Sequence, residues 1–83
     1  MKSNTRNEDV LISFGQHLKK LRESKNISQA QLGLLVDSYQ SSIQRIEYGQ
    51  SNPELCMLVA ISNALDIKLS ELMDFNYEIK SVD

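Results

Sequence analysis

Four polar side chains, none of them acidic, stand close together near the middle of this 83-residue chain: Gln40, Ser41, Gln44 and Arg45. These residue types can hydrogen-bond to base edges in the major groove of DNA, where glutamine pairs with adenine, arginine with guanine and serine with either. A polar stretch of helix is, however, more often only solvated surface. The base-reading interpretation therefore depends on the elements that hold these four side chains.

The element before them is predicted to be a short, well-capped helix. Ser28 can accept a hydrogen bond from the amide of Gln31, and the Gln31 side chain can return to the Ser28 amide, which is the capping-box arrangement. Apolar residues follow at a helical spacing, and we expect them to face the core. They are Leu32, Leu35 and Val36.

A turn and a second helix carry the four polar residues. Residues 37–38, Asp-Ser, favour a turn because short polar side chains compete with the backbone for hydrogen bonds. We expect the second helix to run from residue 39 or 40 to residue 48, with Ile43 and Ile46 on its apolar side. Gly49 suits the left-handed residue after a helix end. Two such short helices need a third surface on which to pack.

The remaining sequence predicts three more helices and no strands, hence an all-α fold. The first helix is expected from residue 8 or 9 to about residue 24, and the fourth over about residues 54–65. Ser70 is expected to cap a fifth helix over residues 71–75. The expected apolar stripes are Val10, Leu11, Phe14, Leu18 and Leu21 in the first helix, and Leu55, Leu58, Ile61 and Leu65 in the fourth.

The chain is predicted to be one domain with a tail at each end. We expect residues 1–7 to be disordered and residues 8–75 to form the domain. Residues 76–83 alternate weakly between apolar and polar side chains. This C-terminal tail is open to three interpretations, an edge strand, a dimer arm or a loose segment, of which we favour the last two.

The charge of the chain is unevenly distributed. The formal net charge is −2, but residues 14–53 carry five cationic and three acidic side chains, a net of +2. Residues 54–83 carry two and six, a net of −4. We therefore expect the basic half to face a polyanion and the acidic half to face away. We expect the side chains of Lys19, Lys20 and Lys25 to be solvated and to attract the polyanion only at long range.

Several classes of protein are not expected. One cysteine, Cys56, cannot form an intrachain disulfide, which fits a reducing cytoplasm, and with His17 as the one histidine a metal site is not expected. We expect His17 at the surface or its boundary and Cys56 in packing or at the surface. No apolar run approaches a membrane span, and no signal-peptide core is present. The chain lacks a nucleophile–base pairing and a phosphate-cradling loop, so neither an enzyme, a cofactor nor a small-molecule ligand is expected.

Six runs of residues resemble the Cro/C1 (xenobiotic-response-element type) family of DNA-binding domains, and the resemblance covers about residues 14–75. The runs are Leu18-Lys19-Lys20-Leu21-Arg22, Ser28-Gln29, Leu32-Gly33, Ile43-Gln44-Arg45-Ile46-Glu47-Tyr48-Gly49, Asn52-Pro53-Glu54-Leu55, and Ala64-Leu65 through Leu69-Ser70-Glu71-Leu72. The resemblance implies a compact five-helix bundle of the lambda-repressor-like type, in which helices two and three form the helix-turn-helix.

The resemblance also implies roles for individual residues. Base contacts are implied for Gln40, Ser41 and Arg45, with Gln44 and Ser42 as flanking candidates for base or phosphate contact. Phosphate contacts are implied for Gln29, Tyr48, Gly49 and Gln50. A structural ion pair is implied for Arg22 and Glu47, which would be scaffold rather than DNA contacts.

The chain departs from the family at the turn. Ser38 stands where a buried aliphatic residue is usual, Asp37 at the usual turn glycine, and Gly33 where alanine is common. We expect a repacked turn in which Tyr39 fills the gap left by Ser38.

The functional prediction is a cytoplasmic, sequence-specific DNA-binding transcriptional regulator, a repressor before an activator. A homodimer is expected, reading a palindrome with half-sites about 34 Å apart, because one recognition helix gives too little specificity. The alternative is a protein-interaction or antitoxin-like module on the same fold, with DNA binding secondary. The acidic pI of about 5.3 and the apolar fourth helix motivate this alternative.

Overall fold

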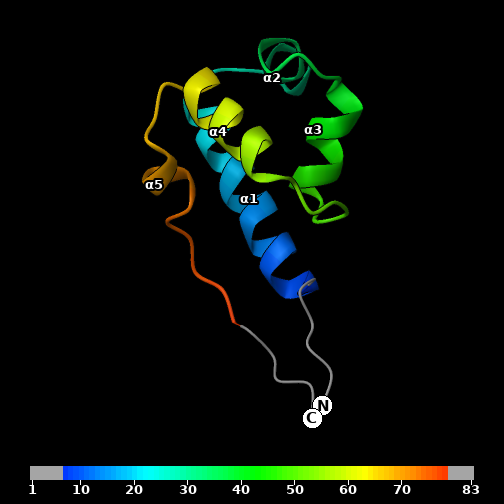
Figure 1. Cartoon of the computed structure of the whole chain (residues 1–83), viewed down its shortest axis with the longest axis vertical. Helices are drawn as coiled ribbons and strands as arrows, with labels where there is room; N and C mark the ends of the chain where they lie inside the picture. The colour runs from blue at the N-terminus through cyan, green and yellow to red at the C-terminus, as the bar shows by residue number, and fades with distance from the viewer. Residues whose placement is uncertain (1–6, 79–83) are drawn as a thin grey trace.

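Five helices form the part of the chain that this computed structural model describes, residues 7–78. They are α1 (Glu8–Ser24), α2 (Gln29–Leu35), α3 (Gln40–Glu47), α4 (Leu55–Ala64) and α5 (Leu69–Leu72). No strand occurs between residues 7 and 78. Figure 1 shows α1 as the long central element, with α3 and α5 on opposite sides of it and α2 beyond one end. The predicted all-α class is confirmed.

The helix ends follow from local residues. Ser28 and Gln31 form the predicted capping box at the start of α2. Asn7 was expected to belong to the N-terminal tail but caps α1, because its side chain accepts a hydrogen bond from the Val10 amide. Left-handed backbone angles follow four of the helices, with positive φ at Asn26, Asp37, Gly49 and Asp66. Three of the turns are therefore made by short polar residues rather than by glycine.

One apolar cluster holds the helices together. Its members come from all five helices and are almost completely buried: Phe14, Leu18, Leu32, Ile43, Ile46, Ile61, Leu65 and Leu72. At about 25 cal/mol per Å² of apolar surface, burial of these side chains is the main stabilising contribution. The cluster fixes α2 and α3, which are too short to be stable alone.

Two residues of the expected apolar stripes are largely exposed instead of packing in the core. Leu35 is 60% exposed, because α2 is only two turns long and buries Leu32 and Gly33 instead. Leu55 is 67% exposed, because it is the first residue of α4 and lies beyond the cluster. The helical spacing of apolar residues therefore predicted too many buried positions, because these short helices have too few neighbouring elements to cover all of them.

The fifth helix also differs from the prediction. It begins at Leu69 and ends at Leu72, and its cap position is Lys68, with no side-chain capping bond. Ser70 is thus inside the helix rather than its cap, because packing of Leu69 against the core starts the helix earlier. Phe75 lies beyond the helix, where its ring meets that of Phe14 edge-on at 5.5 Å.

The described residues include only part of the two predicted tails. Residues 1–6 and 79–83 lie outside the described residues. Asn76–Glu78 form neither helix nor strand, and the Tyr77 ring lies 5.3 Å from that of Phe75. No helix between residues 7 and 78 has the length and apolar character needed to cross a membrane.

We predict that Gly15→Ala destabilises the fold. At an exposed position inside a helix, alanine is more stabilising than glycine by about 1 kcal/mol. At Gly15, however, a methyl group would overlap the backbone carbonyl oxygens of Ile46 and Glu47, so α1 and α3 would have to separate. We expect the free energy of unfolding to fall by about 1–3 kcal/mol, measured by urea denaturation. Gln16→Ala, at an exposed neighbour, is the control, and a Gly15→Ala protein as stable as that control would contradict the prediction.

Candidate nucleic-acid interface

The orientation of α3 is set by its buried side. Ile43, Ile46 and Glu47 are almost completely buried against the rest of the bundle. The predicted base-reading residues are all exposed and free of side-chain hydrogen bonds or ion pairs within residues 7–78: Gln40, Ser41, Gln44 and Arg45. Ser41 and Arg45 lie opposite the buried side and Gln40 and Gln44 border it, so the four form one exposed polar face. No acidic side chain belongs to this face. The helix therefore presents hydrogen-bonding groups of the predicted kind to solvent.

The start of α3 is held against α2. A methyl group at Gly33 would lie 2.7 Å from the carbonyl carbon of Tyr39 and 2.9 Å from the amide nitrogen of Gln40. The amide of Ser38 donates to the carbonyl of Gly33 at 2.8 Å, and Asp37 between the helices has φ +57°. Glycine thus permits an approach of the two backbones that a larger residue would obstruct.

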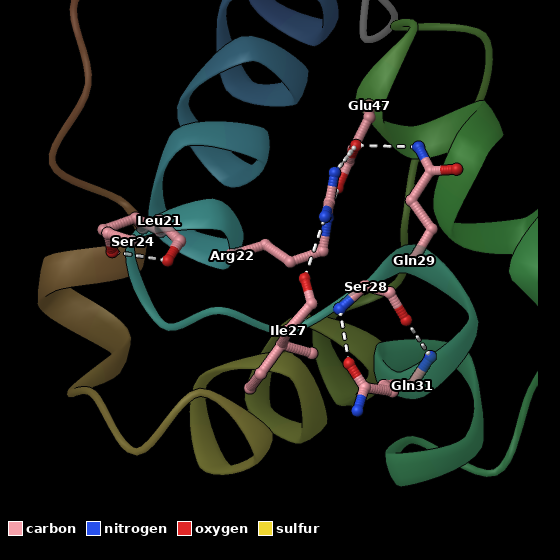
Figure 2. Close-up of polar contacts among 8 residues, drawn as sticks. All are labelled: Leu21, Arg22, Ser24, Ile27, Ser28, Gln29, Gln31 and Glu47. Carbon is pink, nitrogen blue, oxygen red and sulfur yellow. Dashed lines mark hydrogen bonds and ion pairs between the residues drawn. The ribbon is translucent and has the colours of Figure 1, made fainter.

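A buried carboxylate joins α1, α2 and α3. Glu47 accepts from Arg22 twice, from Nε at 2.6 Å and from Nη2 at 2.9 Å, and from Gln29 Nε2 at 2.9 Å (Figure 2). Arg22 Nη1 also donates to the Ile27 carbonyl at 2.8 Å. The hydrogen bond with Glu47 raises the pKa of Arg22 above its ordinary value, so the guanidinium stays charged. The structure thus contains the ion pair that the family resemblance implied.

The bond between Gln29 and Glu47 was missed by the sequence interpretation. Gln29 was assigned to phosphate alone and Glu47 to Arg22 alone, and the crossing of α2 and α3 that joins them is not readable from spacing. Gln29 is half-buried, and its amide nitrogen has a second N–H beyond the one given to Glu47. Because Glu47 is the last residue of α3, Gln29 lies at the opposite end of that helix from Gln40.

The other phosphate candidates lie within α3 or directly after its last residue. Tyr48 and Gln50 are exposed just after the helix. Gly49 has φ +72°, a backbone angle that favours glycine, and a methyl group there would lie only 2.7 Å from the Ile12 side chain. Both the backbone angle and the limited space therefore favour glycine at this position. The half-buried Ser42 lines an open hollow of about 260 Å³.

The turn is not repacked as expected. Tyr39 is 77% exposed and does not fill the gap left by Ser38. Ser38 instead lines the 260 Å³ hollow, which Tyr39 does not border. With its backbone held against Gly33, Tyr39 has extended angles of φ −127° and ψ 157°, and its side chain is left in solvent.

The acidic half of the chain does not lie wholly apart from this face. Glu54 lines the same hollow as Arg45, which corrects the expectation that the acidic half faces away. No ion pair joins these two residues within the described part of the chain.

The remaining polar candidates are surface residues. Lys19, Lys20 and Lys25 are exposed, as is Cys56, and His17 is half-buried with Nε2 3.1 Å from the Glu71 carbonyl oxygen. Between residues 7 and 78, no three His, Cys, Asp or Glu side chains gather as a metal site would require.

Comparison with known proteins fits this geometry. The family model HTH_3, described as helix-turn-helix, matches residues 18–72. The chain belongs to this helix-turn-helix family. Membership identifies it as a DNA-binding transcription regulator of the Cro/C1 type rather than an enzyme, as the sequence predicted.

Individual relatives are similar over most of their length. Control protein C.MunI of Mycoplasma sp is 42% identical over 65 residues, which span 77% of this chain and 88% of that protein. The restriction-modification controller protein C.AhdI of Aeromonas hydrophila superposes with a TM-score of 0.73 at 39% identity, over 75% of this chain and 94% of that one. The P22 c2 repressor, solved with a synthetic operator, gives 0.66 at 29% identity, over 71% and 89%.

We predict that Arg22→Ala is strongly destabilising, because it leaves the buried Glu47 carboxylate without its charged partner. Loss of one member of a buried ion pair typically costs about 3–5 kcal/mol. The thermal midpoint should fall accordingly in a circular-dichroism melt. Lys20→Ala, which removes an exposed cation of the same helix, serves as the control. Equal melting of the two variants would mean that the Arg22–Glu47 pair contributes nothing to stability.

Proposed function

We propose that this regulator reads a specific operator in double-stranded DNA by placing α3 in the major groove. The observation that carries the proposal is the contrast between the two sides of α3. On the buried side the Glu47 carboxylate is fully engaged, whereas on the exposed side four polar side chains are left without partners in the described residues. Those four match the donor and acceptor types that distinguish base pairs in that groove. We assign base contacts to Gln40, Ser41, Gln44 and Arg45.

The phosphate contacts are proposed to fix the register of α3. Gln29 is held by Glu47 beside the segment that follows α3, so its remaining N–H, the exposed Tyr48 and Gln50 side chains and the Gly49 backbone would meet one strand together. Ser42 flanks the base-reading face from the hollow. Such contacts orient a protein on the duplex without reading its sequence.

A homodimer completes the proposal. One eight-residue helix contacts too few base pairs to select an operator, and a second copy would place another helix about 34 Å away. Leu55 and Val59 lie one turn apart on α4, and both are exposed at 67% and 40%. An exposed apolar pair on one face suits association with its counterpart in a second copy.

The regulated system is proposed from similarity. C.AhdI, at 39% identity, is named as a restriction-modification controller, and C.MunI, at 42%, as a control protein. We propose that the present chain controls a restriction–modification operon in the same way, from the cytoplasm. An operator for this chain should then lie upstream of the corresponding endonuclease or methyltransferase gene.

Selection of bound duplexes from random DNA tests the central proposal, and we predict that it yields a palindrome with half-sites about one helical turn apart. Gln40→Ala should then weaken binding to that site by about 1–3 kcal/mol and relax the preference at one base pair of each half-site. Gln29→Ala should weaken selected and scrambled duplexes about equally. Titrations of both variants against both duplexes measure these changes.

Two results would contradict this assignment. An unchanged base preference in Gln40→Ala would remove that residue from the reading face. A parent protein that shows no selected sequence, yet retains a stable protein partner in pull-downs, would favour the interaction-module alternative.

We predict that Leu55→Glu separates the homodimer, because a carboxylate would be buried against an apolar partner surface. Sedimentation velocity should show a dimer for the parent and a monomer for the variant at the same concentration. Leu35→Glu, at an exposed leucine of α2, is the matched control and should remain dimeric. A dimeric Leu55→Glu protein would move the interface away from this face of α4.

A further inference from the structure

Tyr39 is an aromatic residue whose side chain has no structural role among the described residues. Its side chain is 77% exposed, and within residues 7–78 its ring stacks on no other ring and its hydroxyl has no hydrogen-bond partner. The residue also fails to cap α3, since no side-chain capping bond is made there. The tyrosine therefore contributes neither to the core nor to the helix end.

The exposure of Tyr39 does not come from a loose backbone. Its carbonyl oxygen accepts from the amides of Ser42 and Ile43 at 3.1 and 3.3 Å. On the other side its carbonyl carbon lies where a methyl group on Gly33 would be only 2.7 Å away. The main chain is thus held between α2 and α3, and the phenol projects from a fixed point.

This fixed point lies at the leading end of the proposed recognition helix. The N-terminal residues of such a helix enter the groove. Tyr39 directly precedes Gln40 and has the extended backbone angles of an N-cap residue. It therefore stands at the end of the helix, outside the helical positions of Gln40, Ser41 and Arg45, which are assigned to the base edges.

The width of the major groove then determines which part of the DNA the Tyr39 side chain would contact. A helix with its side chains is about 10–12 Å across, and the major groove is about 12 Å wide. Little space remains for a further side chain at the helix end, and the walls of the groove are the sugar–phosphate strands. An apolar ring that ends in a hydroxyl donor suits such a wall.

We propose that Tyr39 is a further DNA-contact residue, with its ring against a deoxyribose and its hydroxyl donating to a phosphate oxygen. The inference rests on the proposed placement of α3 in the major groove. The contact reads no base and neutralises no phosphate charge. It therefore strengthens binding to every sequence equally and leaves the salt dependence of binding unchanged, unlike a lysine or arginine contact.

The test compares Tyr39→Phe and Tyr39→Ala with the parent on the selected operator and on a scrambled duplex. Removal of the hydroxyl should weaken binding to both duplexes by about threefold to tenfold per protomer. Removal of the ring as well should weaken both by more than tenfold. The ratio between the two duplexes, and the slope of affinity against salt concentration, should stay those of the parent.

Tyr77→Phe is the matched control, because Tyr77 is also an exposed tyrosine, at 53%, but lies beside Phe75 and away from α3. It should bind both duplexes as the parent does. Circular-dichroism melts should show the Tyr39 variants folded like the parent, since an exposed side chain is removed.

Two outcomes would overturn the inference while the proposed function stands. If the parent selects an operator and both Tyr39 variants bind like Tyr77→Phe, the residue does not touch DNA. If the variants lose preference at one base pair instead, Tyr39 contacts a base edge and not the strand. Failure of the parent itself to prefer any duplex is a different result, which would reject the proposed function.

Discussion

The carboxylate of Glu47 is the constraint on which the rest of the arrangement depends. Burial of an ionised carboxylate costs several kcal/mol, and this cost is offset only where good hydrogen-bond geometry is complete. Here three donors from two other helices converge on it, two from Arg22 and one from Gln29. Without α1 the charge would be uncompensated, and without α2 it would lose one of its three hydrogen-bond donors. The network therefore makes α1, α2 and α3 a single unit.

This constraint also decides which side of α3 faces solvent. Successive residues of an α-helix are separated by about 100°. Once Glu47 points to Arg22, the apolar Ile43 and Ile46 also point inward, and Ser41 and Arg45 point outward. Gly15 and Gly33 then set how closely α1 and α2 approach α3, because a methyl group at either would meet its backbone. The exposed polar face, which we propose reads the DNA, is thus defined by contacts made on the other side of the helix.

The sequence predicted those features that depend on neighbours along the chain. The capping box at Ser28, the turn at residues 37–38 and the glycine at 49 are local features, so the sequence predicted them. Exposure of Leu35, Leu55 and Tyr39 was not predicted, because it depends on which helix lies opposite. The same applies to the bond between Gln29 and Glu47, whose residues are 18 positions apart. The family resemblance supplied the Arg22–Glu47 pair, which spacing alone would not have given.

Charge near the reading face bears on how the proposed regulator would distinguish its operator. Arg45 is unpaired there within the described residues, yet Glu54 lines the same hollow and would repel nearby phosphates. With a net charge of −2 for the chain, attraction to DNA in general is weak. Binding must then depend more on hydrogen bonds and close packing in the groove, and these contacts are lost when the DNA sequence is not that of the operator. A small acidic protein of this kind can therefore be selective without holding non-specific DNA tightly.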